Sequence, residues 1–176
     1  MKDLKQFNIH YTGLKNGSHS FNYQIDNTFF EAYNFDDFFE TNINVALQLE
    51  KKSTLFNLSF TAKGTVNIAC DVSGESFDQE ISASLTLIVK FGETFNDENE
   101  EVLILPYSEF QLNVAQYIYE MIVLAVPSKR IHPKVIDGSM ESDALNRLET
   151  LRVQKTTANV DPRWDKLKSL IIDKKT

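Results

Sequence analysis

The feature that most constrains the fold is a long alternation of apolar and polar residues in the middle of the chain. From Phe56 to Cys70 the even positions carry apolar residues or glycine, and polar residues fill most positions between them. Side chains of a strand alternate between two faces, and a turn at Gly64 would often shift the phase. The phase is kept, so the pattern predicts one long strand, bent at Gly64, rather than two hairpin arms.

Similar alternation predicts further strands before and after this one. It occurs at residues 7–11, 21–25, 43–49 and 81–91, and a short apolar run follows at 102–105. The aromatic stretch 29–39 fits neither period, which favours a short helix or an irregular packed segment. A straight strand as long as 56–70 would span roughly 50 Å, so we expect the sheet to curl.

One long apolar helix is predicted at residues 113–126. Asn113 and Gln116 have the spacing of a capping box, and Pro127 cannot continue a helix. The segment is apolar on nearly every side, which predicts burial against the sheet. Gln116 and Glu120, four residues apart, would form its one wet edge.

These elements predict an α+β fold: a strongly curved antiparallel sheet, a partial barrel, packed on the single buried helix. The core domain would span residues 1–127. A basic, flexible arm would follow at 128–160, and a short amphipathic helix at 161–174 would end the chain. Asp161 is a good N-cap for that helix, and Pro162 suits its first position.

The charge is divided unevenly along the chain. Residues 1–126 hold 7 Lys and Arg against 18 Asp and Glu, a net −11; residues 127–176 hold 11 against 7, a net +4. An acidic body with a basic tail indicates an anionic partner for the tail, with RNA the obvious candidate. The alternative is that the tail folds back on its own acidic body.

The basic side chains expected to bind a partner form two groups. The first group follows the predicted helix. Cations near a helix C-terminus stabilise the helix, so phosphate contact and a structural role both stay open for this group. The second lies on the predicted terminal helix, where the tryptophan is a docking anchor more often than a base-stacking platform. The two groups are Lys129, Arg130, His132 and Lys134, and Arg163, Trp164, Lys166 and Lys168.

The sequence contains no recognised enzyme template, neither a phosphate-binding glycine loop nor a nucleophile or zinc motif, so we expect no enzyme. The single cysteine, Cys70, excludes an internal disulfide and suits a reducing compartment. It has no thiolate or imidazole nearby at ligand spacing, so we expect a small core residue, with no metal and no cofactor. The start of the chain shows no secretory signal, which favours the cytoplasm.

Three stretches resemble the YceD family, the large ribosomal RNA subunit accumulation proteins. Residues 68–77 resemble its strand-and-loop signature, 112–127 its helix, and 161–170 its C-terminal motif. Ser73 stands where many members have a second cysteine, and Val72 where many have arginine. The matching positions are Cys70, Phe77, Asn113, Glu120, Pro127, Asp161 and Pro162.

The resemblance implies a role in the synthesis, processing or stability of large-subunit ribosomal RNA. On this basis we expect a non-enzymatic assembly factor that binds precursor RNA, ribosomal proteins, or both, through the arm and the terminal helix. The alternative is an adaptor whose acidic body binds a basic ribosomal protein. A metal-dependent RNA-processing enzyme is a third hypothesis, which would require carboxylates clustered around a metal. The oligomeric state stays open.

Overall fold

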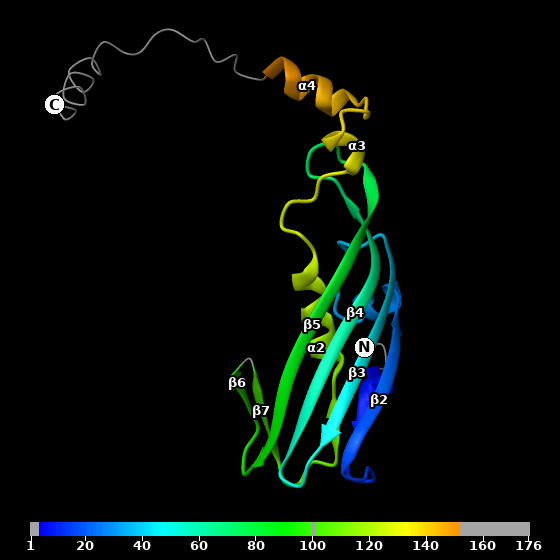
Figure 1. Cartoon of the computed structure of the whole chain (residues 1–176). Coiled ribbons are helices and arrows are strands. Elements are labelled where there is room, and N and C mark those ends of the chain that lie inside the picture. Colours follow the sequence, from blue (N-terminus) through cyan, green and yellow to red (C-terminus); the bar gives the residue numbers. More distant parts are fainter. Residues whose placement is uncertain (1–3, 100, 152–176) are drawn as a thin grey trace, which may run out of the picture. The chain divides into compact units, whose positions relative to one another are not determined.

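A computed structural model describes residues 4–99 and 101–151 (Figure 1). It divides into two compact units, Met1–Met140 and Glu141–Thr176. The second unit contains α4 (Asp143–Leu151), whose first turn is capped by the Ser142 hydroxyl, an acceptor for the Leu145 N–H at 3.3 Å. In the described ranges, no helix is long and apolar enough to cross a membrane.

The first unit is built on a six-stranded sheet in the order β2–β3–β4–β5–β7–β6. A separate two-stranded pair joins β1 to β8. The strands are β1 (Asn8–His10), β2 (Gly17–Ile25), β3 (Glu40–Lys51), β4 (Leu55–Ala69), β5 (Ser76–Gly92), β6 (Asn96–Asn99), β7 (Val102–Pro106) and β8 (Gln111–Asn113). The helices are η1 (Leu4–Phe7), α1 (Asn27–Glu31), α2 (Ala115–Ala125) and α3 (Pro133–Ile136).

The long strand predicted from the alternation is confirmed. β4 runs without interruption through Gly64 and pairs with β3 on one side and β5 on the other. At Gly64 the neighbouring strand comes so close that a Cβ atom would lie 2.1 Å from the Asn42 carbonyl oxygen. Glycine is therefore needed here for close approach of two backbones.

The predicted fold class is wrong in three respects. β5 and β7 pair in parallel, so the sheet is mixed rather than antiparallel. The described strands form an open sheet from β2 to β6, and no closure into a barrel occurs among them. In place of one long helix there are several short ones. Alternation reveals which side chains share a face, but it carries no information on strand direction or closure.

Aromatic side chains cover the apolar face near β2 and β3. The stretch after β2 forms α1 and a turn, as the mixed pattern predicted, and buries Phe29, Phe30 and Phe38. The Phe30 ring lies 4.9 Å from that of Phe38, and Tyr33 stacks on Tyr119 of α2 at 4.3 Å. This cluster fixes one side of α2 against the sheet.

The helix α2 is shorter and less buried than predicted. It begins at Ala115 because Asn113 belongs to β8, where it pairs with Asn8. Ile118 and Ile122 are fully buried against the sheet, whereas Leu124 is 83% exposed. Gln116 and Glu120 are exposed, as expected. The prediction of burial on all sides is therefore wrong for the face that carries Leu124.

Replacing Ile122 by alanine removes a fully buried side chain and should lower the free energy of unfolding by about 2–5 kcal/mol. Leu124→Ala on the same helix is the matched control, and its effect should stay within about 0.5 kcal/mol because that side chain is exposed. Chemical denaturation measures both. Equal losses for the two variants would contradict this account of which face of α2 is buried.

Candidate functional site

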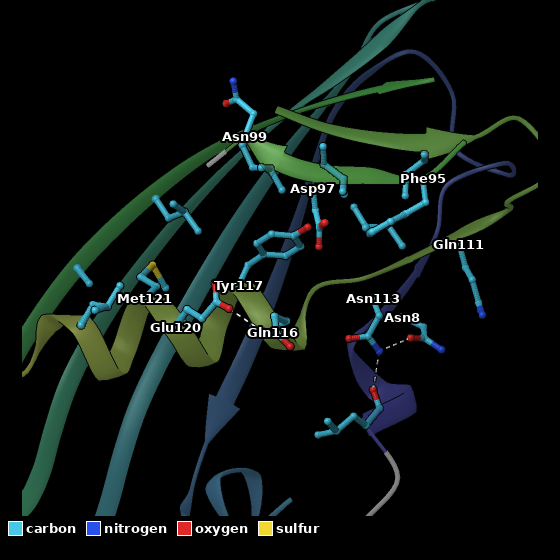
Figure 2. A pocket seen from close by; sticks show the side chains of 18 of the residues that line it. Asn8, Phe95, Asp97, Asn99, Gln111, Asn113, Gln116, Tyr117, Glu120 and Met121 are labelled. Atoms are coloured by element: carbon cyan, nitrogen blue, oxygen red, sulfur yellow. Dashed lines mark hydrogen bonds between the residues drawn. The ribbon is translucent and has the colours of Figure 1, made fainter. Parts of the chain in front are cut away.

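A groove of about 1390 Å³ lies between α2 and the sheet margin formed by β5 and β7 (Figure 2). Its floor is apolar and its rim carries amides and carboxylates. The floor includes Ala83, Leu85, Leu87, Leu103, Leu105, Met121, Leu124 and Ala125, and the rim includes Asn8, Phe95, Asp97, Asn99, Glu109, Gln111, Asn113, Gln116, Tyr117 and Glu120.

The groove exists because the apolar face of β5 is only partly covered. β7 pairs with β5 solely along Ile88–Gly92, so in the described residues the apolar face of the sheet ends at β5 beside Ala83 and Leu85. Ala83 and Leu85 are consequently half-buried, although they continue the apolar alternation of the strand. The exposed Leu124 of α2 faces the same space. The result is an apolar floor open to solvent.

The rim of the groove is negatively charged. Among the described residues, three carboxylates line it, those of Asp97, Glu109 and Glu120, and no Lys or Arg side chain does. In Figure 2 the Tyr117 ring rises from α2 toward Asp97 of β6. Burial first, and then the charges of Asp97 and Glu120, raise the pKa of Tyr117 to about 12. Such a rim favours cationic groups over phosphates.

Asn113 fastens the N-terminal segment beside the groove. Its side chain accepts a hydrogen bond from the Ala115 N–H at 2.9 Å and donates to the Leu4 carbonyl at 3.3 Å and to the Asn8 side chain (Figure 2). The predicted capping box is wrong, since Gln116 instead donates to Glu120 at 2.6 Å. The amide thus supports the start of α2 and also holds η1 and β1 in place.

A second structured feature is the hairpin tip, residues 70–75 between β4 and β5, to which residues 130–132 bind. The Arg130 N–H donates to the Asp71 carboxylate at 2.8 Å, and the Asp71 N–H donates to the Arg130 carbonyl at 2.8 Å. The His132 N–H donates to Cys70 Sγ at 3.2 Å. The segment after α2 is therefore bound to the sheet through its backbone.

Cys70 is buried, as expected for a small core residue. Burial alone would raise its pKa, but hydrogen bonds from the His132 N–H, the Ser73 side chain and the Ser73 and Val72 N–H groups outweigh this and lower the pKa to about 7. In the described part of the chain, no group of three or more His, Cys, Asp or Glu side chains could hold a metal ion.

The four basic residues after α2 differ in what their side chains do. Arg130 Nη2 lies 3.3 Å from the Asp37 carboxylate, and the His132 ring packs 5.3 Å from the buried Phe77 ring. His132 Nδ1 also accepts the Lys134 N–H at 3.0 Å, which caps α3. Lys129 and Lys134 are exposed, as is Pro127. The structure therefore brings these four together at the tip, with two side chains engaged internally.

The other predicted residues, Asp161, Pro162, Arg163, Trp164, Lys166 and Lys168, and the predicted helix 161–174 lie outside the described residues. The mobility expected for residues 128–160 stays a prediction. Sequence patterns miss most of the groove and indicate only Asn113, Gln116 and Glu120 of its rim, through their family positions or their place on the wet edge of the helix. The acidic residues of 93–101 are the available signal, but nothing in the sequence places them beside Leu85 and Tyr117.

One known protein family matches most of this chain. Residues 58–171 match the family described as large ribosomal RNA subunit accumulation protein YceD. The chain belongs to this family. The matched range starts inside β4 and includes both the hairpin tip and α2, so both features lie within the part that defines the YceD family match. No curated protein and no solved structure matches the chain at a significant level.

Replacing Cys70 by alanine should cost about 1–3 kcal/mol of unfolding free energy, because a buried thiol and its hydrogen bonds are lost. The cost should depend on pH. A pKa lowered from 9.0 to about 7 in the folded state stabilises the fold fully above about pH 9, and this contribution is lost as the pH falls below about 7. The difference between the native protein and Cys70→Ala should therefore be larger at pH 9 than at pH 6.

Chemical denaturation of both proteins at the two pH values measures this difference directly. The same loss at both values would contradict a depressed thiol pKa. Elemental analysis of the purified native protein addresses the related expectation that Cys70 binds no metal. One zinc ion per chain would overturn that expectation.

Proposed function

We propose that this member of the YceD family is a non-enzymatic assembly factor in the cytoplasm that supports accumulation of large-subunit ribosomal RNA by binding precursor particles. The acidic body would bind a basic ribosomal protein, and the basic end of the chain would bind RNA. The observation that carries the proposal is the separation of charge between the body, with its carboxylate-lined groove, and the end of the chain.

The positive charge lies further along the chain than the residues bound at the hairpin tip. Residues 127–151 hold 4 Lys and Arg and 4 Asp and Glu, so they are neutral in sum. Residues 152–176 hold 7 Lys and Arg and 3 Asp and Glu, which accounts for the whole positive surplus of +4. Phosphate binding is therefore assigned chiefly to the last stretch, with Arg163, Lys166 and Lys168, and only secondarily to Lys129 and Lys134.

Binding rather than catalysis is supported by the one place where a cysteine and a histidine come together. Cys70 Sγ accepts the backbone N–H of His132, not its ring, and the ring nitrogen Nδ1 is used to cap α3. The imidazole is therefore not positioned to act as a base for the thiol, as it does in a cysteine–histidine catalytic pair. Here both groups stabilise the tip.

The adaptor alternative, in which protein binding alone suffices, is favoured by one observation. Arg130 is paired with Asp37, so the cluster after α2 offers fewer free cations than its composition indicates. In that case the groove would carry the function, and the basic end would contribute little to association with precursors.

Charge reversal in the full chain separates these possibilities. The set Arg163→Glu, Lys166→Glu and Lys168→Glu should weaken binding to large-subunit precursor RNA and lower the salt slope of that binding by about 0.7–0.9 for each phosphate that is no longer bound. The matched pair Lys129→Glu and Lys134→Glu should have the smaller effect. Filter binding at several salt concentrations measures the slopes.

Co-sedimentation of the tagged protein with precursor particles tests the assembly role itself. We expect the native protein on large-subunit precursors and a reduced level of mature large-subunit RNA when the protein is depleted. Normal RNA levels after depletion would contradict the proposed function. Full co-sedimentation of the triple variant would favour the adaptor alternative.

A further inference from the structure

The outer edge of β5 is open along most of its length. β4 pairs with β5 from Ser76 to Lys90, but on the other side β7 pairs only from Ile88 to Gly92. In the described ranges, no strand pairs with this side of β5 between Ser76 and Leu87. Figure 1 shows β7 beside one end of β5 only. An open edge of this length is a template for another strand.

The direction of the free backbone groups follows from two hydrogen bonds. The Ile88 N–H donates outward to the Glu101 carbonyl at 2.8 Å, while the Cys70 N–H donates to Glu75 across the β4–β5 register at 2.8 Å. Odd-numbered residues of β5 therefore bond to β4, and even-numbered ones point outward. The outward groups before Ile88 belong to Ser76, Asp78, Glu80, Ser82, Ser84 and Thr86.

The groove reaches around this edge. Ser82 and Ser84 lie on the exposed face of the sheet, and Ala83 and Leu85 lie on its apolar face. All four line the same space. A groove can be bordered by both faces of one strand only across an open edge, so a ligand in it has access to the outward N–H and C=O groups and to the apolar floor together.

The charge around the edge selects among possible occupants. The groove is lined by Asp97, Glu109 and Glu120, and Asp78 and Glu80 project from β5 itself. In the part of the chain that the structure describes, no Lys or Arg side chain lines the groove. A phosphate backbone would be repelled, whereas lysine or arginine side chains flanking the added strand would face carboxylates.

We propose that the outer edge of β5 is a strand-addition site for an extended, cationic segment of a partner protein, with its apolar side chains on the groove floor. Backbone hydrogen bonds to Ser82, Ser84 and Thr86 would give affinity, and the apolar floor and acidic rim would give specificity. That the segment comes from a large-subunit ribosomal protein rests on the proposed function. The site itself rests on the geometry.

A second copy of this chain is a poorer occupant than a cationic partner. Pairing two β5 edges would gather Asp78 and Glu80 of both chains in one pair of strands. It would also bring two sets of groove carboxylates together. Like charges across a sheet edge disfavour pairing. The charge that attracts a basic segment thus keeps copies of this chain apart.

A synthetic peptide of alternating lysine and valine is the probe, added to the full chain. We expect binding together with slower amide hydrogen exchange at Ser82, Ser84 and Thr86 and little change at odd-numbered neighbours. The matched control is the same peptide methylated on every backbone nitrogen, which keeps charge and side chains but cannot donate a backbone hydrogen bond from either edge. Its binding should fall at least about tenfold.

Charge complementarity is tested separately. The variant Asp97→Lys with Glu120→Lys should bind the lysine–valine peptide at least about tenfold more weakly. Glu75→Lys, at the hairpin tip and outside the groove lining, is the control and should bind like the native protein. A glutamate–valine peptide should not bind the native protein. Thermal unfolding checks that each variant is folded.

Several results would overturn the site. Equal binding of the methylated and unmethylated peptides would exclude strand addition, and unchanged exchange at Ser82, Ser84 and Thr86 would exclude this edge. Protection of the edge without peptide, rising with protein concentration, would assign it to a second copy. Protection of the edge by RNA that increases in Asp97→Lys with Glu120→Lys would assign it to nucleic acid.

The site and the proposed function can fail independently. If the peptide binds as expected but the protein does not accompany large-subunit precursors, the site stands and the assembly role fails. If the protein accompanies precursors and the Asp97→Lys, Glu120→Lys variant does so equally well, the assembly role stands and this site is not its means of attachment.

Discussion

The fold depends on a mismatch in length between a long sheet and the short helix that packs on it. β5 has 17 residues and would span about 56 Å if straight, whereas α2 has 11 residues and spans about 16 Å. The apolar face of β3, β4 and β5 is continuous, so every part of it that α2 leaves uncovered needs another cover or meets water.

Each end of the sheet obtains a cover from a different segment of the chain. The Phe29–Phe38 aromatic cluster lies over the β2 and β3 side, and residues 130–132 close the hairpin tip through Asp71 and Cys70. Between these covers the margin of β5 near Leu85 has none in the described residues. The groove is thus the part of a continuous apolar face that these covering segments leave exposed.

The parts of this structure that the sequence predicted are those governed by local pattern. Alternation located β4 through Gly64, and Pro127 marked the end of the helix correctly, because both act on neighbouring residues. The parallel pairing of β7 and the exposure of Leu124 were missed, since they depend on which distant segment arrives at a given edge. The family resemblance, carried by the motifs at residues 68–77, 112–127 and 161–170, supplied the biological context, which alternation and charge alone did not contain.

This arrangement offers a physical reason for the acidic character of the body. An open, partly apolar strand edge is a hazard because it pairs with any similar edge, including its own copy. Natural sheets often protect such edges with lysine, which would repel a basic partner as well. Asp78, Glu80 and Asp97 would give the same protection against self-pairing and would leave the edge attractive to cations. Under the proposed function, where ribosomal proteins are basic and RNA is anionic, the negative charge of this edge would exclude nucleic acid and the protein's own copies and would admit a basic protein segment.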